Sequence, residues 1–353
     1  MLLRLSLSFV LLLAISPATD AAAPVSRARY LMGTVCEGVA LPPHPEGTDS
    51  EAEAAAALEA AFDEIARLER VLSDYRDDSE LSRLNREGQA APFRCTTDLF
   101  DLLQAAAGFS RDTQGAFDMT VGPLVAAWDL RGRGRVPDPA ALASAREATG
   151  WDKLLLDSAS GTVRFRVPGM RLDPGGIGKG YALDAAAGVL KRRGITRALL
   201  DFGGQILALG APDGATAWEA SIAHPLRRDL SAMSMALRDA SISTSGNAEK
   251  GLVVEGRRLG HILDPRTGMP LATTASVSVV APTAVEADAL STALLVMGPE
   301  AGLRWAATRP DLSVVFLEVN PDGELRIRSS ANSRHIAPPG PAPDGVNSSR
   351  RNR

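Results

Sequence analysis

A glycine-dense segment, residues 173–180 with the sequence Asp-Pro-Gly-Gly-Ile-Gly-Lys-Gly, leads into a helical pattern. Glycine lets backbone amides approach a phosphate closely, and Lys179 together with a helix N-terminus would add positive potential. The segment is not a Walker A loop, because Gly180 stands where Ser or Thr is needed. Nor is it a dinucleotide fingerprint, because Tyr181 replaces the third glycine. It therefore predicts either a phosphate contact by another type of loop or a tight turn that packs a helix on a strand.

Asp288 and Thr292 lie four residues apart in residues 286–295, which have the pattern of a helix. That spacing puts the carboxylate and the hydroxyl on one helical face. Both are hard oxygen ligands of the kind that Mg²⁺ prefers beside substrate phosphates. Asp and Thr at this spacing also often form only a hydrogen bond, so the pair alone leaves a metal undecided.

His261 is one of only four histidines, and it begins a segment with an Asp-Pro turn, residues 261–268. A histidine in this setting can serve as a general base or as a structural hydrogen-bonding group. The preceding segment 243–247, Ser-Thr-Ser-Gly-Asn, is rich in hydroxyl groups. Those groups suit contact with a polar ligand, and turn formation explains them equally well.

Four helical patterns lie around these segments. The first opens at Ser50 with the form of a capping box, and the second follows Thr97. The third begins at Asp138 with proline in its first turn, and the fourth covers about residues 181–193 and ends in basic residues before Gly194. The apolar stripe of the first pattern comprises Leu58, Phe62, Ile65, Leu68 and Leu72.

Strand patterns alternate irregularly with these helices. They cover residues 198–202, 206–209, 277–280, and a hairpin formed by 314–319 and 325–328. The mixed order, without a regular strand–helix repeat, predicts a single large α+β domain rather than a doubly wound sheet.

The ends of the chain differ from its middle in composition. Arg4, the apolar run 5–15 and the small residues that follow have the order of a secretory signal, residues 1–23, although an uncleaved anchor is the alternative. The run is too short for a transmembrane span. We therefore expect a soluble, periplasmic domain over residues 24–336. Residues 337–353, rich in Pro, Gly, Ser and Asn, predict a disordered tail.

Composition and cysteine content exclude several classes of protein. The 353 residues are 45% hydrophobic and 23% charged, which is an ordinary globular mixture. With a net charge of −4 and scattered basic residues, no cationic field would gather nucleic acid. Cys36 and Cys95 are too few for a disulfide framework or a cysteine metal site. A single bridge between them is possible, but two buried free thiols are favoured.

Six stretches in fixed order make the chain resemble the FAD:protein FMN transferase (ApbE-type) family over about residues 30–330. Each stretch alone is only moderately specific, whereas six in family order are strongly so. Met119 and Asn247 depart from the residues usual in the family, but neither is an expected ligand. The stretches are residues 32–34; 72–75 with 79–85; 115–124 with Trp128; the glycine-dense segment; 244–246 with 261–268; and 287–293.

The resemblance implies a T-fold-like β-sheet core with packed helices, and a magnesium-dependent enzyme. Such an enzyme cleaves the pyrophosphate of FAD, attaches FMN to a threonine of an exported acceptor protein and releases AMP. The resemblance also implies that the metal would be held by Gly176 through its carbonyl, Asp288 and Thr292. The FAD contacts that it implies are Met32, Tyr75, Ala116, Phe117, Asp118, Asp173, Lys179 and Ile262.

Phosphoryl transfer depends more on charge neutralisation and on a positioned nucleophile than on covalent help from the protein. His261 is the expected catalytic base, since histidine has an unperturbed pKa near the working range. Two other functions remain possible on the same residues. One is a hydrolase that splits FAD into FMN and AMP with water, and the other is a flavin-binding protein without catalysis, which would need no magnesium.

Overall fold

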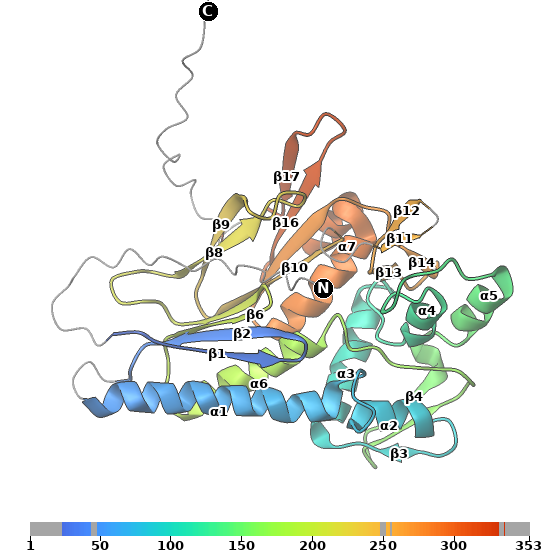
Figure 1. The fold of residues 1–353 in the computed structure, drawn as a ribbon, viewed down its shortest axis with the longest axis horizontal. Coiled ribbons are helices and arrows are strands. Elements are labelled where there is room, and N and C mark those ends of the chain that lie inside the picture. The colour runs from blue at the N-terminus through green and yellow to red at the C-terminus, as the bar shows by residue number, and fades with distance from the viewer. Residues whose placement is uncertain (1–22, 44–47, 248–251, 255, 332–334, 336–353) are drawn as a thin grey trace, which may run out of the picture.

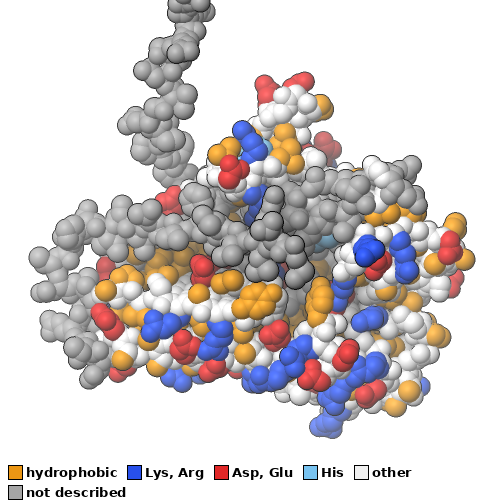
Figure 2. Space-filling view, viewed as in Figure 1, with side chains coloured by type: hydrophobic (Ala, Val, Ile, Leu, Met, Phe, Trp, Pro, Cys, Tyr) orange, Lys and Arg blue, Asp and Glu red, His pale blue; other side chains and the backbone are white. Residues whose placement is uncertain are grey.

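The computed structural model describes residues 23–43, 48–247, 252–254, 256–331 and 335. The predicted secretory signal, except for residue 23, and the predicted tail lie outside these residues. Within the described part of the chain, every helix is too short or too polar to cross a membrane. On the face shown in Figure 2, basic and acidic side chains are interspersed rather than segregated.

An eight-stranded sheet forms the centre of the fold, and each neighbouring pair of strands is antiparallel (Figure 1). The order across the sheet is β1-β2-β6-β7-β10-β15-β16-β17, so chain segments far apart in sequence become neighbours. These strands are β1 Val25–Leu31, β2 Thr34–Ala40, β6 Ala198–Phe202, β7 Gln205–Leu209, β10 Ala240–Gly246, β15 Ser276–Ala281, β16 Ser313–Val319 and β17 Leu325–Ser329.

Three long helices, α1, α6 and α7, pack over one face of this sheet. They are α1 Thr48–Leu72, α6 Gly178–Arg192 and α7 Ala284–Ala306. The apolar stripe of α1 is fully buried, as its helical spacing predicts. The α7 helix is kinked at Gly298, which has a positive φ and precedes Pro299.

The opposite face of the sheet is covered by the hairpin of β8 Trp218–Ala223 and β9 Ser231–Leu237. Trp218 is the largest side chain of that second core, and its indole N–H donates to the carbonyl of Leu209 at 3.0 Å. Strand β15 lies between the two cores and is buried on both faces. Val279 faces α7, and Val280 faces the hairpin.

A smaller helical region lies at one end of the long helices (Figure 1). It contains α2 Glu80–Glu87, β3 Phe93–Arg94, α3 Thr97–Asp112, α4 Gly122–Ala127, α5 Pro139–Glu147, the 3-10 turn Trp151–Lys153, β4 Leu154–Asp157 and β5 Thr162–Phe165. Two further antiparallel strand pairs lie outside this region: β11 Leu252–Val254 with β12 Arg257–Leu259, and β13 Leu263–Asp264 with β14 Met269–Pro270.

The predicted α+β class is confirmed, and several predicted boundaries need correction. α1 begins at Thr48, so Ser50 lies inside the helix and is not its N-cap. α6 begins at Gly178 rather than near Tyr181, because tertiary packing accepts glycines in its first turn. Residues 243–246 belong to β10 and do not form a turn. The expected N-cap at Asp138 is confirmed, since its carboxylate accepts two backbone amides of α5.

The two cysteines are free, as favoured by the sequence. Cys36 is buried in β2, whereas Cys95 is only partly buried. Burial raises the pKa of each thiol to about 12. Both therefore remain protonated and unreactive near neutral pH.

Candidate active site

The glycine-dense segment lies directly against α7. A Cβ atom at position 176 would fall 2.9 Å from Oγ1 of Thr292 and 3.4 Å from the ring of Phe117. Only glycine therefore lets this backbone approach both side chains so closely. The structure thus brings together three of the predicted site residues from three separate parts of the chain.

Asp288 lies on the same helix, one turn before Thr292, and is only 5% exposed. Its Oδ2 accepts the backbone N–H of Gly180 at 3.0 Å. Burial raises the pKa of Asp288, while the positive charge of Lys179 and the bond from Gly180 act in the opposite direction. A buried carboxylate of this kind gains from a cation placed beside it.

The N-termini of α6 and α7 are held together by two further contacts. Gly180 packs so closely on α7 that a Cβ atom there would fall 2.3 Å from the carbonyl oxygen of Ala284. The carboxylate of Asp184 accepts the backbone amides of Ala284 at 2.8 Å and Val285 at 2.9 Å. Asp184 thereby satisfies two of the unpaired amides at the start of α7. These contacts fix the position of Asp288 relative to the glycine-dense segment.

Hydroxyl groups connect α7 to strand β10. Oγ of Ser245 lies 2.9 Å from Oγ of Ser291 and 3.5 Å from Oγ1 of Thr292. Ser291 also reaches Ser243 at 3.3 Å. The hydroxyl groups of the hydroxyl-rich segment therefore connect strand β10 to helix α7, and these contacts set the position of Thr292.

The oxygen donors in this region have the chemistry that magnesium prefers. The Asp288 carboxylate, the Thr292 hydroxyl and the Gly176 backbone are hard oxygen groups, and they converge around the N-terminal half of α7. Among the residues that the structure describes, no group of three His, Cys, Asp or Glu side chains forms a metal site. A metal here would thus depend on this mixed set and on oxygens of its substrate.

Phe117 and Ala116 follow a sharp turn at the end of α3. Gln114 and Gly115 both have positive φ angles, and the amide of Phe117 donates to Oγ1 of Thr113 at 3.1 Å. Phe117 then meets Phe109 edge-on, with ring centroids 6.2 Å apart. The turn therefore presents a rigid aromatic side chain beside Gly176.

Asp118 directly follows this turn and is half-buried. Its Oδ1 accepts both the backbone N–H and the hydroxyl of Thr120 at 2.7 Å. Burial nevertheless raises the pKa of Asp118 to about 6. Asp118 is consequently a carboxyl group whose charge changes in the physiological range.

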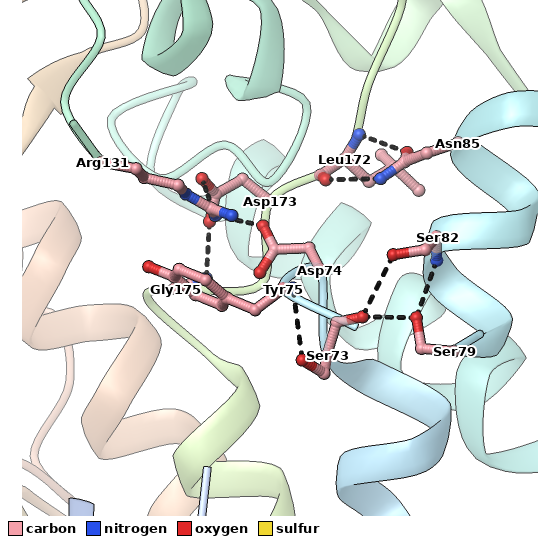
Figure 3. A network of polar contacts seen from close by, with 10 residues as sticks. All are labelled: Ser73, Asp74, Tyr75, Ser79, Ser82, Asn85, Arg131, Leu172, Asp173 and Gly175. Carbon is pink, nitrogen blue, oxygen red and sulfur yellow. Dashed lines mark hydrogen bonds and ion pairs between the residues drawn. The ribbon is translucent and has the colours of Figure 1, made fainter. Parts of the chain in front are cut away.

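Tyr75 lies on the surface, beside a compact ionic network (Figure 3). The guanidinium of Arg131 lies 4.5 Å from the centre of the Tyr75 ring. Arg131 also forms ion pairs with Asp74 and with Asp173, the latter at 2.6 Å. Two predicted FAD contacts, Tyr75 and Asp173, are therefore joined by one arginine.

Met32 lies in a strand turn, and Lys179 lies in the first turn of α6. Met32 and Gly33 form the two-residue turn between β1 and β2, and both have positive φ angles. The neighbouring β6–β7 turn packs on this one, since a Cβ at Gly203 would fall 2.7 Å from Oγ1 of Thr34. Burial raises the pKa of both Asp201 and Asp288, and the nearby positive charge of Lys179 opposes that rise at each carboxyl group.

The segment that contains His261 is anchored by its own far end. The indole N–H of Trp128 donates to the carbonyl of Gly268 at 2.8 Å. His261 is half-buried, and its neighbour Ile262 packs against both cores of the helix-covered face. Arg266 holds Asp264 through two contacts of 2.9 and 3.0 Å. The segment is thus a fixed turn rather than a loose loop.

Sequence reasoning missed Arg131 and Asp184 as residues of the site. Arg131 stands in the run Arg-Gly-Arg-Gly-Arg, which has the form of a solvated charged loop. Asp184 lies in the middle of a helix, and nothing in the local sequence marks it as the cap of a different helix. Asp74 belongs to one of the six stretches, but its neighbour Tyr75 alone received a role.

Comparisons with known proteins identify the family of the chain. Residues 32–316 match the model of the ApbE family. The chain is 36% identical over 322 residues to an FAD:protein FMN transferase of Treponema pallidum, covering 87% of this chain and 86% of that protein. It is 33% identical over 302 residues to one of Klebsiella pneumoniae, covering 82% and 85%.

Solved structures give the same result. The flavin transferase ApbE from Vibrio cholerae superimposes with a TM-score of 0.76 at 29% identity, covering 89% of this chain and 99% of that one. The apo flavinyl transferase ApbE from Pseudomonas stutzeri gives a TM-score of 0.77 at 28% identity, covering 88% and 95%.

Proposed function

The chain belongs to the ApbE family, and we propose that it is a magnesium-dependent FAD:protein FMN transferase. It would cleave the pyrophosphate of FAD, attach FMN to a threonine hydroxyl of an exported acceptor protein and release AMP. The family membership supports transferase activity with FAD.

The observation that carries the proposal is the approach of Gly176 to Thr292 and Phe117. The glycine-dense segment leads into the N-terminus of α6 and Lys179, which suits the pyrophosphate of FAD. Asp288 and Thr292 of α7 would hold magnesium together with the Gly176 carbonyl. When bound there, magnesium supplies charge neutralisation on the pyrophosphate.

The chain's own residues then have distinct tasks. Tyr75 and Phe117 would bind the flavin, and Lys179 would hold the phosphates. The acceptor hydroxyl oxygen forms a bond to the phosphorus of the FMN half, and the bond from that phosphorus to the bridging oxygen breaks. AMP leaves with the bridging oxygen, and the hydroxyl proton passes to a base.

His261 is the side chain that we assign as this base. Asp264, the other possible base of the same turn, is engaged by Arg266 through two side-chain contacts and a third contact from the Arg266 backbone amide at 2.9 Å. That engagement makes Asp264 an anchor of the turn. An ordinary histidine has a pKa close to neutral pH, so its imidazole can accept this proton.

Intact mass spectrometry tests the proposal most directly. The protein is incubated with FAD, magnesium and a purified candidate acceptor, and both the acceptor mass and the small molecules are measured. A mass gain of one FMN on the acceptor, with AMP in equal amount, supports transfer. Free FMN and AMP without a mass gain would assign a hydrolase, because water then replaces the acceptor at the same site. Unchanged FAD would leave only flavin binding.

The proposed compartment is the periplasm, because residues 1–23 have the pattern of a secretory signal. An exported acceptor would meet the enzyme there. Cell fractionation with the full-length chain tests this part, and recovery of the mature protein in the cytoplasm would contradict it.

A further inference from the structure

Arg131 makes three contacts to two separate loops. Its guanidinium lies over the ring of Tyr75 at 4.5 Å, and it pairs with Asp74 in the loop after α1. A third contact joins it to Asp173 at the start of the glycine segment, at 2.6 Å. The Arg131 side chain is 28% exposed, whereas those of Asp74 and Asp173 are 4% and 11% exposed. A cation with two desolvated anionic partners is held far more firmly than one in a surface pair.

The contact with Arg131 fixes an aromatic ring that little else restrains. Tyr75 is 77% exposed, and it donates a hydrogen bond to Oγ of Ser73 at 3.2 Å through its backbone amide rather than through its side chain. A cation over an aromatic face is attracted by the ring quadrupole, so Arg131 favours one orientation of the Tyr75 ring. Figure 3 shows Arg131 against the Tyr75 ring. The rest of the ring is exposed and offers a flat surface to a planar ligand.

The second anchor passes into the glycine segment. Oδ1 of Asp173 accepts the backbone N–H of Gly175 at 2.8 Å, while its Oδ2 is held by Arg131. Asn85 fixes the preceding residue, because its amide exchanges two hydrogen bonds with the backbone of Leu172 at 2.8 and 3.0 Å. Arg131 is therefore tied to the backbone that leads to Gly176.

We propose that Arg131 is the positioning residue of the flavin site: it orients Tyr75 for stacking with the isoalloxazine ring and holds the glycine segment in register with it. This inference rests on the proposed function, which supplies FAD as the ligand. Arg131 acts through Tyr75 and Asp173, and it does not neutralise the phosphates of FAD. An arginine beside a nucleotide ordinarily binds the phosphates directly, and this is the role from which the proposal differs.

Binding of fragments of FAD separates the two roles without any need for turnover. Riboflavin carries the isoalloxazine ring without phosphate, and ADP carries a pyrophosphate without the flavin. Titration calorimetry would compare riboflavin, ADP and FAD on the wild type, Arg131→Met and Arg133→Met. Arg133 is the matched control, because it is an exposed arginine two residues away in the same loop.

Arg131→Met should weaken riboflavin and FAD binding by about tenfold or more, as expected for loss of a cation–π contact and a charged anchor. ADP binding should change by less than about twofold, and Arg133→Met should leave all three affinities near wild type. In the transfer reaction, KM for FAD should rise while kcat at saturation stays close to wild type. Loss of ADP binding with unchanged riboflavin binding would overturn the proposal and assign Arg131 to phosphate.

A second variant guards against a trivial loss of folding. Arg131→Met leaves Asp74 and Asp173 unpaired, and Asp173 already raises the pKa of Asp74 in addition to burial. The double variant Asp74→Asn/Arg131→Met removes one carboxylate together with the arginine and should recover thermal stability. Riboflavin binding should remain weak in this folded double variant. Recovery of wild-type riboflavin affinity would show that Arg131 serves only as a counter-charge, and the positioning role would be wrong.

Discussion

Gly180 lies so close to Ala284 that a Cβ atom at position 180 would fall 2.3 Å from the carbonyl oxygen of residue 284. The backbone N–H of Gly180 also donates a hydrogen bond to Oδ2 of Asp288. One residue therefore sets both the contact between two helices and the orientation of the expected metal ligand.

Gly180→Ala should consequently be destabilising, although alanine favours helices. The added methyl group meets backbone, which cannot move aside, and overpacking of this kind costs about 1–3 kcal/mol. Gly188→Ala in the same helix is the matched control, because its Cβ would meet only the flexible end of Arg192 at 3.2 Å. That variant should gain up to about 1 kcal/mol from helix propensity. Urea unfolding measures both, and equal stabilities would contradict the close approach.

Asp288→Asn should abolish FMN transfer while the protein stays folded. The amide oxygen can still accept the N–H of Gly180, and a buried group that carries no charge is easier to bury, since burial raises the pKa of Asp288. Thr292→Ala should reduce transfer less, because a neutral hydroxyl gives less to a cation. A chelator should stop turnover of the wild type and leave FAD binding detectable by fluorescence. Full activity of Asp288→Asn would refute the metal assignment.

Asp118 should make the stability of the protein depend on pH. Its pKa in the folded protein is about 6 against an ordinary value of 3.8. The folded state therefore binds the Asp118 proton more tightly than the unfolded state does. The contribution of protonated Asp118 to the free energy of unfolding is complete below about pH 4 and is lost as the pH rises through about 6. Relative to Asp118→Asn, the wild type should lose up to about 3 kcal/mol over that window.

Denaturant unfolding at pH 4.5, 5.5, 6.5 and 7.5 would measure this difference, with the exposed Asp229→Asn as a control. Parallel curves for the wild type and Asp118→Asn would argue against the raised pKa. FAD titration over the same range would also show whether ligand binding depends on the charge of Asp118.

His261→Asn should lower FMN transfer by about a hundredfold, which is the contribution usual for general-base catalysis. The amide keeps a hydrogen-bonding group but cannot accept the proton. FAD affinity should stay near that of the wild type. In rate measurements across pH, the limb that rises with deprotonation of a histidine should disappear. A fall of less than about tenfold would leave His261 only an orienting role.

Tyr75→Ala should weaken FAD binding more than it lowers the rate at saturating FAD, since loss of a stacking ring affects ground-state binding. The side chain is largely exposed, so thermal stability should change little. Tyr30→Ala removes another exposed tyrosine, 70% accessible on β1, and serves as the control. A normal dissociation constant for Tyr75→Ala would exclude stacking.

Much of the architecture follows from local patterns. The buried stripe of α1, the cap at Asp138 and the β16–β17 hairpin depend on residues a few positions apart, so the sequence displays their signals directly. The start of α6 was misplaced because Gly178 and Gly180 have low helix propensity. Their helical conformation is explained by packing on a helix that lies more than a hundred residues later.

The site shows the same division. Asp288 and Thr292 could be paired from their spacing, since one helix holds both. The link from Arg131 to Asp74 and Asp173 joins positions about 40 to 60 residues apart, and no periodicity encodes such a contact. The resemblance to a known family identified the expected FAD contacts. The residues that hold these contacts in place could be found only from the three-dimensional packing.

The order of strands in the central sheet has a consequence for how the protein acquires its flavin. Strand β2 pairs with β6, Cys36 opposite Phe202, so a loop of more than 160 residues must close before the Met32 turn has its support. Closure of long loops carries an entropic cost and makes folding slow. The proposed flavin site, which would extend from Met32 to Thr292, should therefore be complete only at the end of folding. FAD binding should follow the appearance of helical circular dichroism during refolding, and it marks chains that have finished folding.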